Sequence, residues 1–194
     1  MRVIGITGGV GAGKSRILDL LEEEFGAQVI QADLVAKELE EPGRPGYQKL
    51  VETFGRGILS EDGTIDRAAF ADLIFSDEAA LRQVNAIIHP MTWQAVKDRI
   101  GKSGKDLVVI EAALFDERSR KACGELWFVD ASKENRIRRL MENRGYSREK
   151  SLGIMENQPS REAFLALADQ VIDNNGTVDD VLSQIRQILK RQES

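Results

Sequence analysis

The chain has little of what marks membrane, disulfide-bonded or nucleic-acid-binding proteins. It has one cysteine, Cys123, in 194 residues, so no disulfide can form within it. No apolar run reaches the ~20 residues that a membrane-spanning helix needs. The net charge of −5 argues against non-specific binding to nucleic acid or to anionic membranes. We therefore expect a globular protein with no nucleic-acid partner and no membrane partner.

The scarcity of cysteine also bears on location. A single cysteine suits a reducing compartment, and Met1-Arg2-Val3-Ile4-Gly5 lacks the apolar core of a signal peptide. We expect a cytoplasmic protein. Cys123 has no catalytic residue types beside it in the sequence, so we expect a buried, inert thiol.

Short apolar runs alternate with segments of helical periodicity. The runs lie at 3–7, 27–30, 107–110, 126–129 and 171–172. Helical spacing covers 17–25, 34–39, 133–142 and 178–189. Strands separated by helices form parallel sheets, because a connecting helix returns the chain to the same end of the sheet. The pattern predicts an α/β fold, with a five-stranded parallel sheet between layers of helices.

A long helical region interrupts this alternation. Pro42-Gly43-Arg44-Pro45-Gly46 breaks the pattern, and helical spacing then dominates from about 45 to 100. His89-Pro90 predicts a join between two helical segments, because proline usually ends a helix. We expect an insertion over the ligand-binding edge of the sheet, within one domain that spans 1–194.

Residues 8–15 read GGVGAGKS and satisfy the P-loop motif G-x-x-x-x-G-K-[ST]. The glycines let the backbone curl so that its N–H groups point at phosphates, and the helix that follows adds its own N–H groups. Lys14, which we expect to face solvent without nucleotide, reaches the β- and γ-phosphates, and the Ser15 hydroxyl can bind Mg²⁺. The motif predicts nucleotide binding by seven residues: Gly9, Gly11, Ala12, Gly13, Lys14, Ser15 and Arg16.

The motif does not decide what happens to the γ-phosphate. The guanine-reading N-K-x-D motif of GTPases is absent, and so is the dinucleotide fingerprint G-x-G-x-x-G. The chain is too short for the usual additional modules of a motor or large ATPase. Its size, helical insertion and arginine-rich late segment favour a small-molecule kinase of the P-loop NTPase fold.

Six ordered segments resemble the dephospho-CoA kinase family, and together they span nearly the whole chain. They are 6–15 (ITGGVGAGKS), 29–33 (VIQAD), 62–67 (DGTIDR), 88–90 (IHP), 158–162 (QPSRE) and 168–176 (ADQVIDNNG). The resemblance implies phosphorylation of the ribose 3′-hydroxyl of dephospho-CoA by Mg·ATP. It also implies that the insertion at about 45–100 covers the acceptor, and that a lid lies at about 139–158.

Two other functions stay open. One is a P-loop kinase for another nucleoside or nucleotide, and the other is a nucleotide-binding regulator without turnover. The chain also departs from the family. Gln31 stands where the family usually has the first of two aspartates, and Asn143-Arg144-Gly145 stands where the lid usually reads Arg-Asp-Gly.

Three residues are candidates for binding the acceptor. Asp33 follows the second predicted strand, which we expect beside the P-loop strand, so Asp33 could orient or deprotonate the acceptor hydroxyl. Its alternative role is the N-cap of the helix at 34–39. Arg67 could bind a substrate phosphate or form a surface ion pair. His89 could be a packed or capping imidazole, whereas the resemblance implies contact with the acceptor.

Arginines late in the chain are candidates for stabilising the transferred phosphoryl group. Five of them lie at 136, 138, 139, 144 and 148, and we expect most to form a solvated face. Because guanidinium groups match phosphate oxygens, one or two should be catalytic, with Arg139 first and Arg144 second. Glu111 could help hold Mg²⁺ or be a solvated carboxylate. Asn175 lies in a turn that we expect to flank the adenine.

Overall fold

The computed structural model describes residues 1–191, which form two compact units. Unit 1 contains Met1–Val29 and the chain from Ser103 onward, and unit 2 is Ile30–Lys102. No helix of the described part is both long and apolar enough to cross a membrane. The elements of unit 1 are β1 (Arg2–Thr7), α1 (Lys14–Phe25), β3 (Leu107–Glu111), α6 (Glu117–Arg120), β4 (Glu125–Asp130), α7 (Lys133–Arg144), α8 (Arg148–Glu156), α9 (Arg161–Leu167), β5 (Gln170–Asp173) and α10 (Val178–Lys190). The strand β2 (Gln28–Gln31) crosses the boundary between the units.

The five predicted strands form one sheet in the order β2-β3-β1-β4-β5. The pairs β1–β3, β1–β4 and β4–β5 are parallel. The prediction that β2 lies beside the P-loop strand β1 is wrong, because β3 lies between them. A crossover helix can bring the next strand to the adjacent position or carry it one position further, so the order along the chain does not decide the order in the sheet.

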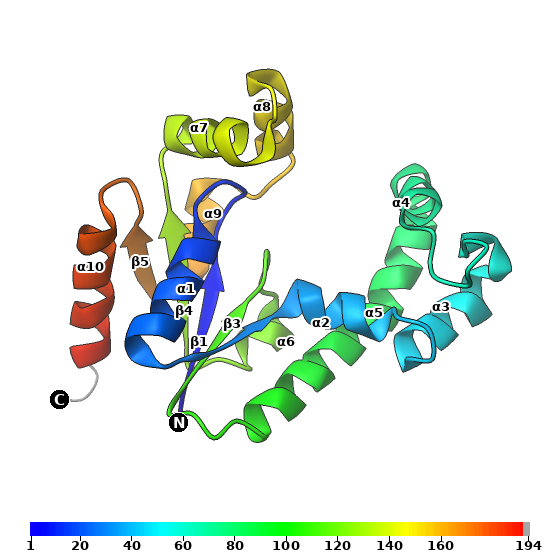
Figure 1. Ribbon diagram of the computed structural model, residues 1–194, viewed down its shortest axis with the longest axis horizontal. Coiled ribbons are helices and arrows are strands. Elements are labelled where there is room, and N and C mark those ends of the chain that lie inside the picture. Colours follow the sequence, from blue (N-terminus) through cyan, green and yellow to red (C-terminus); the bar gives the residue numbers. More distant parts are fainter. Residues whose placement is uncertain (192–194) are drawn as a thin grey trace. The chain divides into compact units, whose positions relative to one another are not determined.

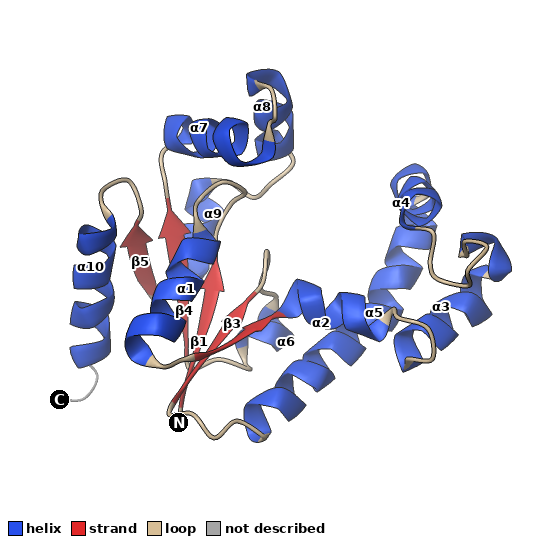
Figure 2. Ribbon diagram, in the orientation of Figure 1, coloured by secondary structure: helices blue, strands red, loops and turns tan. Residues whose placement is uncertain are grey.

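Helices cover both faces of the sheet in unit 1, as the alternation of elements predicts (Figures 1 and 2). On one face, side chains of α1 and α10, such as Leu21 and Ile185, share a core with Ile6 and Trp127 of the strands. On the other face, Phe128 of β4 stacks on Phe164 of α9, with ring centroids 5.0 Å apart. Successive strand residues point to opposite faces, so Trp127 and Phe128 serve the two cores. The three-layer α/β fold is confirmed.

The segment from 143 to 160 contains helices that its polar sequence did not reveal. The helix α7 continues to Arg144 and ends at Gly145, whose φ of 63° is the left-handed C-cap conformation that glycine adopts readily. The helix α8 follows after an N-cap serine, Ser147, whose side chain accepts a hydrogen bond from Lys150 N–H. In α8 the only buried residue is Ser151, so no apolar stripe marked this helix.

Unit 2 beyond the end of β2 consists of helices and connecting loops (Figure 2). The elements are α2 (Ala32–Leu39), α3 (Pro45–Phe54), the 3-10 turn η1 (Arg56–Ile58), α4 (Arg67–Ser76) and α5 (Glu78–Gly101). Buried apolar side chains from α3, α4, α5 and the loop between α3 and α4 form its core: Leu50, Ile58, Ile65, Phe70, Val84 and Ile88.

The expected join at His89-Pro90 is not present, because both residues lie inside the continuous helix α5. Proline removes one backbone hydrogen bond from a helix interior. Buried residues on both sides of it, among them Val84 and Val96, keep the helix packed against the rest of unit 2. Tertiary packing therefore overrides the local preference for a break.

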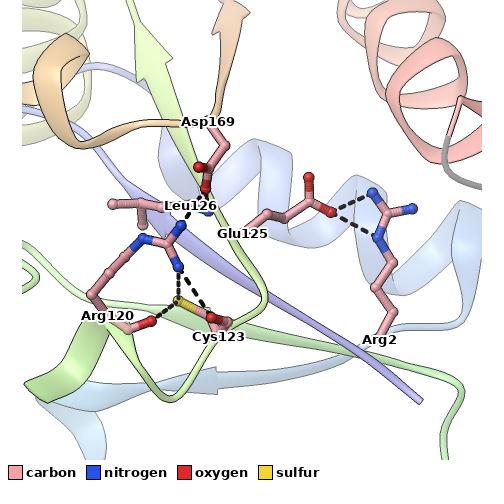
Figure 3. Close-up of polar contacts among 6 residues, drawn as sticks. All are labelled: Arg2, Arg120, Cys123, Glu125, Leu126 and Asp169. Carbon is pink, nitrogen blue, oxygen red and sulfur yellow. Dashed lines mark hydrogen bonds and ion pairs between the residues drawn. The ribbon is translucent and has the colours of Figure 1, made fainter.

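A cluster of polar contacts joins α6, β4 and the start of β5 (Figure 3). The carboxylate of Asp169 accepts hydrogen bonds from the backbone N–H of Leu126 (2.6 Å) and from Arg120 Nη2 (2.5 Å). Arg120 also donates to the carbonyl oxygen of Cys123 (3.1 Å). Cys123 is buried as expected, and burial raises the pKa of its thiol, which keeps it unreactive.

We expect Asp169→Ala to lower the free energy of unfolding by about 1–3 kcal/mol, because the buried N–H of Leu126 loses its acceptor. Asp169→Asn keeps an oxygen acceptor but loses the charge that faces Arg120, so it should cost less. Urea denaturation of the two variants measures the difference. Equal losses for alanine and asparagine would show that the ion pair, and not the bond to Leu126, carries the stabilisation.

Candidate functional site

The P-loop joins the end of β1 to the start of α1. Gly11 and Gly13 have φ angles of 76° and 91°, which residues with a side chain rarely adopt. A Cβ on Gly11 would also lie only 2.7 Å from the carbonyl oxygen of Arg136. Gly13 is the N-cap residue of α1, and no side chain within residues 1–191 caps this helix. The first-turn N–H groups of α1 can therefore bind phosphate oxygens.

Lys14 begins α1 and turns its side chain back over the P-loop. Its Nζ donates to the carbonyl oxygen of Gly8 (2.9 Å) and lies 3.5 Å from Glu111 Oε1 at the end of β3. The Lys14 side chain is only 17% exposed, so the expectation that it faces solvent is wrong. A partly buried ammonium group needs acceptors, and the adjacent strand supplies a carboxylate.

A cavity of about 720 Å³ lies along the P-loop. Its lining includes eight residues that the sequence singled out: Gly9, Gly11, Gly13, Lys14, Ser15, Arg16, Arg139 and Arg144. Ala12 and Asn175 instead line a neighbouring cavity of about 430 Å³. Asn174 borders the larger cavity, and its Nδ2 donates to the carbonyl oxygen of Ala12 (2.7 Å). The turn at 173–176 was expected to flank the adenine, but Asn175 and not Asn174 was the residue chosen from it as a candidate.

The helix α7 presents arginines to the P-loop. Arg139 donates to the carbonyl oxygens of Ala12 (2.9 Å) and Asn174 (2.7 Å), and burial, together with the nearby charge of Arg138, lowers its pKa. Arg136 donates to the carbonyl oxygen of Val10 (2.8 Å). Residues three apart in a helix share a face, which explains why both arginines reach carbonyl oxygens of the P-loop.

The other three arginines are exposed. Arg138 lies 3.6 Å from Glu142, and Arg148 forms two hydrogen bonds with Glu134 (2.7 and 2.9 Å). Both therefore belong to the expected solvated face. Arg144 is the last residue of α7 and borders the 720 Å³ cavity. Its position suits a side chain that could reach a bound phosphate.

The residues near the P-loop fit the coordination habits of Mg²⁺. In the described part of the chain, no group of three or more histidine, cysteine or acidic residues is arranged so that it could hold a metal ion. Mg²⁺ needs no such cage, because it keeps several waters and takes one or two protein oxygens plus substrate phosphates. Ser15 borders the cavity, and the Glu111 carboxylate, whose side chain is 11% exposed, lies 3.5 Å from Lys14 Nζ. A hydroxyl and a carboxylate are oxygen donors of the kind that Mg²⁺ takes.

The three acceptor candidates lie on three helices of unit 2. Asp33 is exposed and is the second residue of α2, whose N-cap is Gln31, so the alternative role of Asp33 as an N-cap is wrong. Arg67 begins α4 and pairs with Glu40, which is the surface ion pair considered above. His89 is exposed on α5, and its Nε2 accepts a hydrogen bond from Trp93 Nε1 (2.9 Å).

Comparison with known proteins connects this site to one family. A sequence model described as "Dephospho-CoA kinase" matches residues 2–180. The chain belongs to the dephospho-CoA kinase family.

Individual relatives agree with that membership. The dephospho-CoA kinase of Carboxydothermus hydrogenoformans is 37% identical over 97% of this chain and 93% of its own. That of Burkholderia lata is 38% identical over 94% of this chain and 91% of its own. The crystal structure of TT1252 from Thermus thermophilus is similar with a TM-score of 0.84 and 29% identity, and it covers 98% of this chain and 97% of that one. The resemblance stated from six short segments is thus confirmed over nearly the full length.

Proposed function

We propose that this kinase transfers the γ-phosphoryl group of Mg·ATP to the ribose 3′-hydroxyl of dephospho-CoA, which gives coenzyme A. The observation that carries the proposal is the P-loop cavity in a chain whose family membership extends over residues 2–180. The cationic groups around this cavity would serve a regulator as well, because any protein that binds ATP must neutralise its phosphates, so the family membership is what favours a kinase. In a kinase these groups also stabilise the negative charge that phosphoryl transfer spreads over the equatorial oxygens of the transferred group.

ATP binds with its phosphates along the P-loop. The N–H groups of the loop and of the first turn of α1 hold the phosphate oxygens, and Lys14 leaves Gly8 to contact the β- and γ-phosphates. Arg144 borders the same cavity and supplies a further positive charge to the transferred group. Arg139, already bound to Ala12 and Asn174, holds the loop and adds its charge nearby.

The acceptor is held by residues of unit 2. Asp33 orients the ribose hydroxyl and takes its proton, since an aspartate can do both for an attacking hydroxyl. Arg67 and His89 bind the rest of the acceptor, with Arg67 exchanging its partner Glu40 for a substrate phosphate. The helical insertion at about 45–100 thereby supplies acceptor specificity, and the lid at about 139–158 excludes water from the γ-phosphate.

Mg²⁺ bound between the phosphates and the protein would neutralise charge that develops on the β- and γ-oxygens. Ser15 and Glu111 would hold it. We expect Glu111→Gln to raise the Mg²⁺ concentration at half-maximal rate by about 10–100-fold, as is typical when a supporting carboxylate is removed. The measurement is a Mg²⁺ titration at saturating ATP, with the exposed Glu117→Gln as a control. An unchanged Mg²⁺ requirement would show that Glu111 does not hold Mg²⁺ and serves as the ion-pair partner of Lys14.

A panel of acceptors tests the proposed function. Wild-type enzyme is given Mg·ATP with dephospho-CoA, AMP or adenosine, and the products are separated and identified. We expect kcat/KM for dephospho-CoA to be the highest by a wide margin, and the new phosphate to be on the ribose 3′-oxygen. A higher kcat/KM for AMP or adenosine would favour a nucleoside or nucleotide kinase, and nucleotide binding without any product would favour a regulator.

A further inference from the structure

A network of three residues holds the middle of the P-loop. The backbone N–H of Val10 donates to Gln158 Oε1 (2.9 Å), and Arg136 Nε donates to the carbonyl oxygen of Val10 (2.8 Å). Arg136 Nη2 donates to the same oxygen of Gln158 (2.8 Å). Both backbone polar groups of Val10 are therefore bound by side chains that lie far from the P-loop in the sequence.

Local structure places both side chains. Arg136 lies on α7 one turn before Leu140, which is buried and borders the P-loop cavity, so this face of the helix adjoins the P-loop. Gln158 lies in the short connection between α8 and α9, and its N–H donates to Met155 O (3.2 Å) at the end of α8. The network thus joins three segments: the P-loop, α7 and the connection that follows α8.

The network bears on phosphate binding because it fixes the conformation of a loop that is otherwise flexible. A glycine-rich loop has many conformations, and ordering it at the moment of binding costs free energy. Gln158 accepts the hydrogen bond of the Val10 N–H, so this N–H group is already bound when nucleotide arrives. Because both the N–H and the carbonyl group of Val10 are held, the flanking glycines and Lys14 keep the conformation in which they line the cavity. Gln158 itself borders that cavity, as Arg139 and Lys14 do.

We propose that Arg136 and Gln158 are positioning residues that hold the P-loop in its phosphate-binding shape and link it to the segment that carries α8. The effect on turnover rests on the proposed kinase function, whereas the effect on nucleotide affinity does not. A residue with this role changes the affinity for nucleotide more than the affinity for the acceptor, and more than it changes the stability of the fold.

The test compares Arg136→Met, Gln158→Met and the double variant, each of which keeps side-chain volume but loses the shared hydrogen bonds. The control is Arg138→Met, which removes an exposed arginine of the same helix that makes no contact with the P-loop. Calorimetric titration gives Kd for Mg·ADP, and steady-state kinetics gives KM for ATP and for dephospho-CoA.

We expect each single variant to raise Kd for Mg·ADP about tenfold, the size that loss of one or two hydrogen bonds produces. The double variant should be no weaker than the weaker single variant, because breaking either partner already breaks the link. KM for ATP should rise in parallel while KM for dephospho-CoA and the values for Arg138→Met stay near wild type.

Two results would overturn the proposal. In the first, the variants lower Tm but leave Kd for Mg·ADP unchanged, so the network supports only the fold. In the second, the double variant is about a hundredfold weaker, so the two residues act independently. A failure of the proposed kinase function appears differently, as wild-type protein that binds Mg·ADP but phosphorylates no acceptor, and it leaves the comparison of Kd values intact.

Discussion

Lys14→Ala is expected to lower kcat/KM by about 10³-fold, the upper range for removing one group that stabilises developing charge in a transition state. Lys14 is the cation of the P-loop itself, and its Nζ already lies between the carbonyl oxygen of Gly8 and the carboxylate of Glu111. With ATP bound, a short movement would bring it to the β- and γ-phosphates. The measurement is kcat/KM for ATP at saturating dephospho-CoA, with circular dichroism to confirm the fold.

The structure adds a control for stability. In Lys14→Ala the mostly buried Glu111 carboxylate loses a cation that lies 3.5 Å away, so the variant should also have a lower Tm. Lys14→Ala combined with Glu111→Gln removes the carboxylate charge as well and should recover part of the lost Tm without recovering activity. The exposed Lys121→Ala should change neither property. A folded Lys14→Ala enzyme with normal turnover would contradict the assignment of the P-loop as the phosphate site.

Asp33→Asn is expected to lower kcat by about 10²-fold or more, the range typical of a lost general base, with KM for ATP nearly unchanged. Asparagine keeps the shape of the side chain but cannot accept the proton of the acceptor hydroxyl at neutral pH. Since Gln31 and not Asp33 is the N-cap of α2, capping is not at stake in this variant. The measurement is kcat and Tm on the same preparation.

A small loss of stability is expected from Asp33→Asn for a separate reason. A negative charge in the first turn of a helix interacts favourably with the helix dipole, by about 0.3–1 kcal/mol. Glu38→Gln is the matched control, because it removes one exposed negative charge from the same helix and breaks only a surface ion pair with Arg99. If Asp33→Asn keeps full kcat, as Glu38→Gln should, Asp33 has no part in the chemistry.

Two kinds of feature could not be predicted from the sequence: contacts between residues far apart in the chain, and elements for which local preference and packing conflict. Val10 and Gln158 are 148 residues apart, and Val10 and Arg136 are 126 apart, so no local pattern indicates that they touch. The continuous helix through Pro90 is an example of conflicting preferences, because proline locally disfavours a helix whereas packing in unit 2 favours it. The polar helix α8 had no apolar stripe to reveal it.

The α/β class, the five strands, the P-loop and the family resemblance could all be predicted from the sequence, because each depends on features of short segments. The alternation of apolar runs and helical spacing reflects the side-chain periodicity of strands and helices. The motif GGVGAGKS is recognisable because its loop needs the dihedral freedom of glycine next to a lysine and a serine. The folded structure was needed to show that β3 and not β2 adjoins the P-loop strand, and hence that Glu111 is the carboxylate beside Lys14. Sheet order and side-chain partners follow from how separate segments pack, and packing is a property of the whole folded chain.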